Sequence, residues 1–304
     1  MGKIAFMFPG QGAQAVGMGK DFYENYEDAK KVYEIASASS GLDVAELCFT
    51  ENDRLNITEY TQIALLTTEV AVLKVIEAKG IKADYCAGLS LGEYGALAAG
   101  NVMSLDDLFK LIRQRGIYMQ EAYPNGGAMM AVLGLDADVI SATCEEIDGI
   151  VSVANDNCPG QIVITGEENA VKAAGEALAA KGAKRCIPLN VSGPFHSKLL
   201  QGAGELLAKD LENVNVSNPE IPYISNVTAD VVNTNDSIKE LLSQQVSSPV
   251  RFRESIMKLK DLGVTTFVEI GPGKTLAGFV RKTDRDLKVI NIEKVEDLEK
   301  LAEL

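Results

Sequence analysis

One short segment constrains the fold of this chain more than any other. Gly88-Leu89-Ser90-Leu91-Gly92 follows a strand pattern at Ala83–Gly88 and leads into a helix pattern. In a strand–turn–helix of this type, side chains in place of the two glycines would collide with the neighbouring strand and helix. The turn holds the Ser90 hydroxyl clear of the backbone, and the following helix directs N–H groups toward any oxyanion beside it. The same five-residue pattern also arises by chance, so its context makes Ser90 a candidate nucleophile.

Short apolar runs alternate with amphipathic stretches along much of the chain, which is typical of an α/β protein. A helix is expected at 104–122, with Ser104 as its N-cap and Asp106 and Asp107 in its first turn. The other elements expected outside the middle of the chain are a strand at Lys3–Phe8, helices at Tyr60–Ala78 and 197–210, and a strand at Thr265–Ile270.

The pattern changes after the turn signal Pro124-Asn125-Gly126-Gly127. The six elements expected there are strands at Ala128–Leu133, Val151–Ala154, Gln161–Thr165 and Lys184–Leu189, and helices at 137–147 and 168–181. This βαββαβ order describes a ferredoxin-like unit. We therefore predict two domains: a larger one from residues 1–124 and 196–304, and a ferredoxin-like one inserted at residues 125–195.

Charge and composition exclude several classes of function. With 29 Lys+Arg against 43 Asp+Glu, the net charge of −14 argues against binding nucleic acid. No apolar run reaches the ~18–20 residues that a membrane span requires, and the first ten residues do not form a secretory signal. The five cysteines never form CxxC, which indicates reduced thiols in the cytoplasm. Because the chain has a single histidine, we expect no metal site.

Two glycine-rich segments imitate nucleotide-binding motifs. The segment that begins Gly10-Gln11-Gly12 offers G-x-G-x-x-A, but no acidic residue ends a second strand about 20 positions later to hold a ribose. Its backbone can still approach a ligand, with the Gln11 amide beside it. Gly271-Pro272-Gly273-Lys274-Thr275 resembles the end of a P-loop, but Val268 stands where the leading glycine belongs. We expect neither a dinucleotide site nor nucleotide hydrolysis.

A serine nucleophile needs a base, and His196 is the only histidine available. A lone histidine is more often an ordinary packed or surface residue. Here it follows Gly193-Pro194-Phe195 and precedes a predicted helix, a loop position from which its side chain can be aimed. Together with the serine turn, this favours a catalytic role.

Arg115 lies on the apolar face of the helix at 104–122, while Arg113 points to the polar side. The apolar face is formed by Leu108, Leu111, Ile112, Met119 and Ala122. A buried guanidinium is costly unless an anion pairs with it. That anion is either an internal Asp or Glu, or a carboxylate that arrives with the substrate and is held in the two-pronged geometry that arginine favours.

Taken together, these motifs resemble the malonyl-CoA:acyl carrier protein transacylases of bacterial type II fatty acid synthesis. GQGAQ, GLSLGE, RQRG, GPFH, SPVRF and EIGPGKTL occur in this order and cover essentially the whole chain. The resemblance implies an α/β-hydrolase-like large domain with a parallel sheet. It also implies an acyltransferase that uses malonyl-CoA and acyl carrier protein, with CoA and phosphopantetheine as substrate arms and no bound cofactor.

The resemblance assigns roles to particular residues. Ser90 would attack the malonyl thioester with His196 as base, and Gln245 would hold the imidazole through a carbonyl. The remaining roles it implies are an oxyanion hole from the N–H groups of Gln11 and Leu91, a carboxylate contact from Arg115, and contacts to the thioester arm from Asn155 and Asn157. Many relatives carry histidine where this chain has Leu89, which leaves His196 as the only candidate base.

Acyl carrier protein is acidic, as this chain is, so docking needs a local basic patch. The candidates are Lys274, Arg281, Lys282, Arg285 and Lys198. For any one of them, a role in complementing a helix C-terminus is an equally good interpretation. We expect a cytoplasmic monomer.

Two other functions remain open at this point. A serine esterase or thioesterase would share the serine turn and would need an aspartate from Asp136, Asp138, Asp148 or Asp156, all within the inserted unit. Such an enzyme would have no use for Arg115 on a neutral ester. A non-catalytic subunit that binds acyl carrier protein would form no acyl-enzyme. A polyketide synthase domain is less favoured.

Overall fold

A six-stranded sheet forms the larger part of the molecule. The computed structural model describes residues 2–191 and 193–304, and its strand order in this sheet is β10-β9-β1-β2-β7-β8. Neighbouring strands are parallel except for β7 and β8, which are antiparallel. The strands are β1 (Lys3–Phe8), β2 (Tyr85–Gly88), β7 (Tyr223–Ile224), β8 (Val231–Val232), β9 (Val264–Ile270) and β10 (Lys288–Ile292).

Helices cover both faces of this sheet. Alternate residues of β1 therefore point into two different cores. Phe6 and Phe8 pack with α4 (Thr58–Ala78), while Ala5 and Met7 pack against the opposite helices. Those opposite helices are α11 (Phe252–Asp261) and α12 (Thr275–Thr283). The remaining helices of the large part are α1 (Lys20–Asn25), α2 (Glu27–Ser40), α3 (Val44–Phe49), α5 (Gly92–Ala99), α6 (Leu105–Ala122), α9 (Gln201–Glu212) and α10 (Ile238–Gln245).

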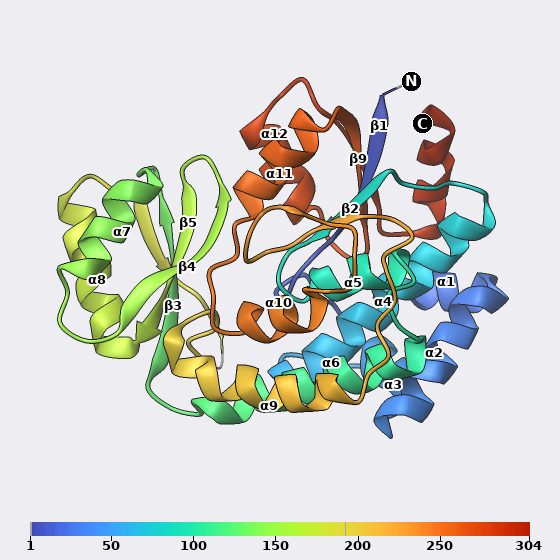
Figure 1. Cartoon of the computed structure of the whole chain (residues 1–304), viewed down its shortest axis with the longest axis horizontal. Helices are drawn as coiled ribbons and strands as arrows, with labels where there is room; N and C mark the ends of the chain where they lie inside the picture. Colours follow the sequence, from blue (N-terminus) through green and yellow to red (C-terminus); the bar gives the residue numbers. More distant parts are fainter. Residues whose placement is uncertain (1, 192) are drawn as a thin grey trace.

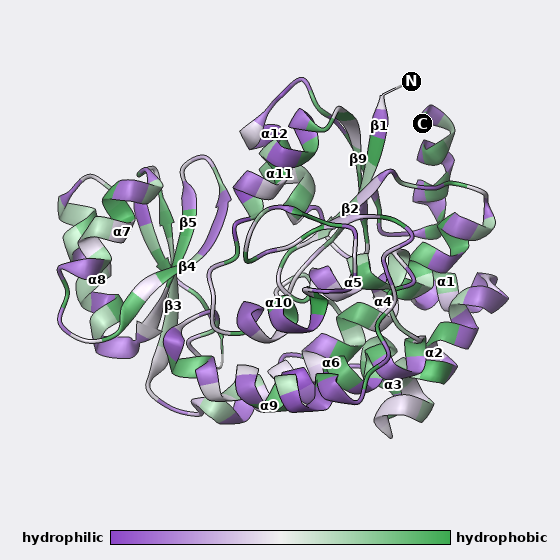
Figure 2. Cartoon of the chain, in the orientation of Figure 1, coloured by the Kyte–Doolittle hydropathy of each residue, from purple (hydrophilic) through white to green (hydrophobic). Residues whose placement is uncertain are grey.

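The distribution of hydropathy follows this layering. In Figure 2 much of β1 is green, while helices at the outside such as α9 alternate purple and green. Within residues 2–191 and 193–304, no helix combines the length and the apolar composition needed to cross a bilayer.

The middle of the chain forms a separate four-stranded antiparallel sheet of order β4-β5-β3-β6, at the left of Figure 1. Its elements are β3 (Gly127–Leu133), α7 (Ala137–Glu145), β4 (Val151–Cys158), β5 (Gln161–Glu167), α8 (Glu168–Ala180) and β6 (Arg185–Pro188). The predicted βαββαβ order is confirmed. One face packs Val132, Ile162 and Ile164 with residues of the two helices, which leaves the other face open toward the large part.

Strand β4 differs from its prediction, since it continues four residues beyond Ala154 to Cys158. The polar run Asn155-Asp156-Asn157 resembles a loop in sequence. The strand accommodates it through register irregularities on either side of Asn155 and Asp156, and Asn155 also bridges to Val250 of the large part.

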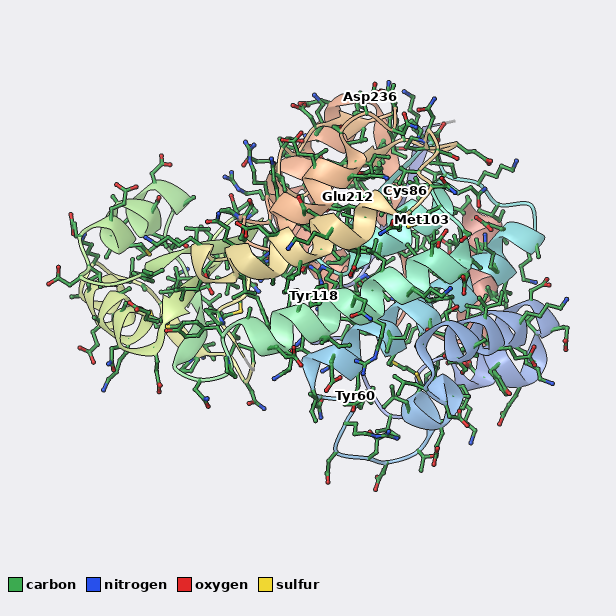
Figure 3. All side chains as sticks on the ribbon, turned by 60° about the horizontal axis from the view of Figure 1, so that its bottom comes forward. Tyr60, Cys86, Met103, Tyr118, Glu212 and Asp236 are labelled. Atoms are coloured by element: carbon green, nitrogen blue, oxygen red, sulfur yellow. The ribbon has the colours of Figure 1, made fainter. Side chains whose placement is uncertain are left out.

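Helix α6 begins as predicted, with the Ser104 hydroxyl accepting a hydrogen bond from the Asp107 N–H at 3.1 Å. It runs beside α9, and the hydroxyl of Tyr118, labelled in Figure 3, donates to Asp210 Oδ2 at 2.8 Å. The prediction that Ala122 lies on the buried face is wrong, because this residue is exposed where the helix ends. The helix expected at 197–210 is a 3₁₀ turn, η1 (Lys198–Leu200), followed by α9.

Candidate active site

Ser90 occupies the sharp turn between β2 and α5 with a backbone φ of 54°, which non-glycine residues rarely adopt. A Cβ at Gly88 would lie 1.9 Å from the Gly92 carbonyl carbon, and one at Gly92 would lie 2.0 Å from the Phe8 oxygen. The glycine requirement read from the sequence is therefore confirmed. It fixes the serine at the edge of the sheet where β1 and β2 end.

Asn226, which lies two residues after the end of β7, holds this turn in place from the neighbouring strand. Its Oδ1 accepts the Ser90 N–H at 2.7 Å, and its Nδ2 donates to the Gly88 oxygen at 2.7 Å. Both hydrogen bonds connect residues more than a hundred positions apart. No sequence pattern around Asn226 marks this role, so the sequence analysis missed it.

His196 reaches the serine from the large part's second segment. Its Nε2 lies 2.7 Å from Ser90 Oγ, and its Nδ1 lies 2.8 Å from the main-chain oxygen of Gln245. Because a carbonyl oxygen only accepts, Nδ1 carries the proton, and Nε2 is left to accept the Ser90 O–H. The expected contact between the imidazole and a carbonyl of Gln245 is thus present.

The environment of His196 keeps its imidazole neutral. The side chain is 4% exposed, and burial together with the nearby Arg115 cation lowers the pKa of His196 to about 4, although its hydrogen bonds to the main chain act in the opposite direction. At neutral pH the imidazole can therefore take up a proton from the serine.

Arg115 lies on the other side of the serine hydroxyl. It is 1% exposed and donates to Gln62 Oε1 at 2.6 Å, to Gln245 Oε1 at 2.9 Å and to Ser90 Oγ at 3.2 Å. Its guanidinium also stacks over the Tyr94 ring, 5.4 Å from the centroid. Burial lowers the pKa of Arg115 below its usual range.

No carboxylate of the described residues forms an ion pair with Arg115, and its Nε has no hydrogen-bond partner among them. By contrast, Arg113 two residues earlier pairs with Glu59 at 2.7 Å and stacks on Tyr60. The internal ion pair considered as an alternative for Arg115 is thus not formed, and its cation faces only neutral acceptors.

Glu93 is an acid that approaches Arg115 through the side chain of Gln245. It is fully buried in α5, and its Oε2 accepts from Gln245 Nε2 at 2.5 Å and from the Asn226 N–H at 3.2 Å. Burial raises the pKa of Glu93 to about 7. The sequence carried a signal for this residue, since Glu93 is the only charged residue between Asp84 and Asp106. Arg115 was singled out as a charged residue among apolar ones, and the same criterion would have found Glu93.

A cavity of about 220 Å³ lies beside these groups, between the two sheets. Gln11 and Leu91 line it, and within the described ranges their main-chain N–H groups donate no hydrogen bond. Asn155 and Asn157 line it from β4, and the buried Asn157 Oδ1 has no partner in the described part of the chain. The remaining wall is largely apolar and includes Met119, Met129, Ala131, Val163, Phe195 and Phe279.

The predicted basic residues all lie exposed, but not on one element. Four belong to α12 or its flanks, namely Lys274, Arg281, Lys282 and Arg285. Lys282 donates to Gln161 Oε1 of β5 at 2.8 Å, which links α12 to the small sheet at the pocket. Lys198 is in η1, directly before α9, and α12 and α9 lie well apart in Figure 1.

Neither an aspartate nor a metal ligand set is found at this site. The imidazole Nδ1 faces a carbonyl, and Asp156 instead pairs with Arg253 at 2.8 Å. Residues 2–191 and 193–304 contain no group of three or more His, Cys, Asp or Glu side chains suited to a metal ion.

Comparison with known proteins gives consistent matches. The acyl transferase domain family matches residues 5–301. The chain is 47% identical over 304 residues to malonyl CoA-acyl carrier protein transacylase of Bacillus subtilis, covering 98% of this chain and 96% of the relative. It is 41% identical over 303 residues to the protein of that name from Staphylococcus aureus strain MSSA476, covering 98% of both.

Solved structures of such proteins also match this chain over nearly its whole length. The malonyl CoA-acyl carrier protein transacylase of Clostridium perfringens superimposes with a TM-score of 0.96 at 43% identity, covering 99% of this chain and 96% of the other. A malonyl-transacylase in complex with its type II PKS acyl-carrier protein gives a TM-score of 0.96 at 38% identity, covering 99% of both chains.

Proposed function

The chain belongs to the acyl transferase family, among the malonyl CoA-acyl carrier protein transacylases, and on that premise we propose the reaction and residue roles that follow. The enzyme is an acyltransferase that moves the malonyl group of malonyl-CoA to acyl carrier protein, and it supplies malonyl-carrier for fatty acid elongation. The transfer runs through a malonyl-serine intermediate in two successive exchanges at one site.

In the first exchange Ser90 Oγ attacks the thioester carbonyl while His196 Nε2 accepts its proton. The tetrahedral oxyanion lies against the N–H groups of Gln11 and Leu91, and each such donor contributes roughly 3–4 kcal/mol when the charge develops. The imidazolium returns its proton to the departing CoA sulfur. In the second exchange the phosphopantetheine thiol gives its proton to His196 and takes the malonyl group from Ser90. The imidazolium then passes this proton to the departing Ser90 Oγ, which restores the free enzyme.

Arg115 holds the malonyl carboxylate in this scheme. A guanidinium that is buried without an internal acid gains most from an anion brought by the substrate. The Ser90 Oγ to Nη2 distance of 3.2 Å puts the cation within reach of an acyl group attached to the serine. Asn155 and Asn157 offer amides to the thioester arm from the small sheet.

The same proposal covers the two domains of the chain. Residues 1–124 and 196–304 form an α/β-hydrolase-like domain, and residues 125–195 form a ferredoxin-like domain inserted into it. The strand order β4-β5-β3-β6 supports the second assignment. The enzyme works as a cytoplasmic monomer and needs no bound cofactor. The carrier docks over Lys274, Arg281, Lys282 and Arg285, with Lys198 at another point of the surface.

The observation that carries this proposal is the position of one hydroxyl, between a neutral imidazole and a cation that forms no ion pair with any described residue. The test is intact-protein mass spectrometry after mixing with malonyl-CoA, followed by mapping of the modified peptide. We expect one malonyl adduct on Ser90 that disappears on adding acyl carrier protein, and no adduct in Ser90→Ala. Free malonate as the main product would support a thioesterase, and carrier binding without an adduct would support a non-catalytic subunit.

A further inference from the structure

Among the described residues, Glu93 is a charged group that the proposed mechanism leaves without a role although only the Gln245 side chain separates it from Arg115. It is 0% exposed, and only its Oε2 is hydrogen-bonded. The bond from Gln245 Nε2 continues through the same amide, whose Oε1 accepts from Arg115 Nη2 at 2.9 Å. A chain of contacts thus runs from Glu93 through Gln245 to Arg115.

Glu93 helps to set which end of the Gln245 side-chain amide faces Arg115. A side-chain amide has one accepting and one donating end, and the two can exchange places by a half-turn. An ionised carboxylate only accepts, so it holds the NH₂ group of Gln245 toward itself and leaves the oxygen toward Arg115. The Gln245 Nε2 contact to the Ser90 oxygen at 3.0 Å favours the same orientation. With the amide reversed, its NH₂ group would face the guanidinium, donor against donor.

The separation between Glu93 and Arg115 also matters for binding the malonyl carboxylate. An acid in direct contact with Arg115 would occupy the guanidinium and compete with the malonyl carboxylate. Placed one amide away, the Glu93 charge still lowers the cost of burying the cation, and it forms no ion pair that a substrate carboxylate would have to displace. The unpartnered Nε of Arg115 agrees with this arrangement.

We propose that Glu93 is a positioning residue for acyl-group selection: acting through the Gln245 amide, it orients Arg115 to receive the carboxylate of the malonyl group. The inference rests on the proposed malonyl transfer and assigns its preference for malonyl over uncharged acyl groups partly to a residue that never touches substrate. The main-chain oxygen of Gln245, which holds His196, does not depend on the amide.

A purely structural role is the alternative, because Glu93 also accepts the Asn226 N–H and Asn226 supports the serine turn. The two roles differ in what they affect. Damage to the turn lowers transfer of every acyl group alike, whereas loss of Arg115 orientation lowers malonyl transfer more than acetyl transfer.

The experiment compares loading of Ser90 from malonyl-CoA and from acetyl-CoA in Glu93→Gln. In Glu93→Gln the Gln245 amide keeps its contact to the Ser90 oxygen but loses the carboxylate as an acceptor, so its orientation is less firmly held. We therefore expect the malonyl-to-acetyl ratio of kcat/KM to fall about tenfold, mostly through KM for malonyl-CoA. Glu69→Gln is the matched control, since Glu69 is also a fully buried acid but lies on α4 outside the pocket lining. It should leave the ratio unchanged.

A double-mutant cycle tests whether the effect passes through the guanidinium. In an Arg115→Ala background, Glu93→Gln should change the ratio less than about twofold, because the group it orients is gone. If Glu93→Gln is not recovered folded, Gln245→Met takes its place: it removes the amide, keeps the main-chain oxygen on His196, and should lower the same ratio.

Equal losses for both acyl groups in Glu93→Gln, or an unchanged ratio in Gln245→Met, would overturn the proposal. Failure of malonyl transfer itself would be seen in the wild-type enzyme. That result would count against the proposed function, and so the two failures are distinguishable.

Discussion

The two sheets of this molecule contribute to the pocket in different ways. The six-stranded sheet contributes loops that follow strand ends: Gln11 comes after β1 and Ser90 after β2. The four-stranded sheet contributes side chains from the strands themselves, such as Met129, Ala131 and Val163. One sheet therefore presents backbone turns and polar groups, and the other presents a largely apolar surface.

The difference follows from strand direction. Parallel strands bring their carboxyl ends to one edge, where the connecting turns and their free N–H groups gather. An antiparallel sheet with helices on one face offers its second face as a flat wall. On the proposed mechanism, the large part carries the bond-making chemistry and the small part sets the shape of the site. Each prediction below tests one side of that division.

The largest effect is expected from His196→Ala. Without the imidazole no group accepts the Ser90 proton, so transfer should fall at least about a thousandfold for malonyl and acetyl groups alike. The rate of adduct formation, measured by mass spectrometry in a rapid-quench series, checks this. A loss of only a few-fold would mean that the chemistry does not depend on this histidine of the large part.

Arg115→Ala should cost malonyl loading about a hundredfold, because a charge-assisted hydrogen-bonded pair contributes roughly 1.5–3 kcal/mol. Acetyl loading, which needs no cation, should be kept or raised. Parallel kcat/KM measurements with both CoA esters decide the matter, and circular dichroism shows that the variant is folded. Equal losses with both esters would make Arg115 a structural residue.

The rate of loading Ser90 should depend on pH differently for malonyl and for acetyl groups. Because His196 has a pKa of about 4, it stays neutral down to pH 5 and acetyl loading should stay level. Glu93, with a pKa of about 7 and facing Arg115 from α6 and Tyr223 from β7, gains a proton as the pH falls. A protonated carboxyl no longer enforces the Gln245 orientation, so the malonyl-to-acetyl ratio should fall up to about tenfold between pH 8 and pH 5.5. Glu93→Gln should remove this dependence.

Asn157→Ala tests the wall of the small sheet. The Asn157 Oδ1 has no partner among the described residues, so its removal should cost the fold little. We expect KM for malonyl-CoA to rise about fivefold with kcat nearly unchanged, consistent with one lost hydrogen bond to the substrate arm. A fall in kcat with KM unchanged would mean that the small part contributes to the chemistry and not only to the shape of the site.

The smallest effect is expected at the surface. Neutralising Arg281 and Lys282 together should raise KM for acyl carrier protein about threefold at low salt, and less at high salt, because exposed charges are screened. KM for malonyl-CoA serves as the internal control and should not change. An unaffected carrier KM would move the docking face away from α12.

Much of the architecture could be predicted because its signals are local. The glycines around Ser90, the cap at Ser104 and the turn after Pro124 act over a few residues, and their predicted consequences are present. The end of β4 could not be predicted, since Asn155 joins a strand only by pairing with partners far away in sequence.

The sequence by itself determined the candidate groups: one imidazole, one serine on a glycine-bounded turn and one arginine on an apolar helix face. Only the tertiary structure decided which groups connect them. Asn226 supports the turn, a main-chain oxygen serves His196, and an amide stands between Arg115 and the nearest acid. Patterns of residue type report what each segment must bury or expose, whereas these hydrogen bonds join segments about 50 to 150 residues apart, whose meeting depends on how the whole chain packs.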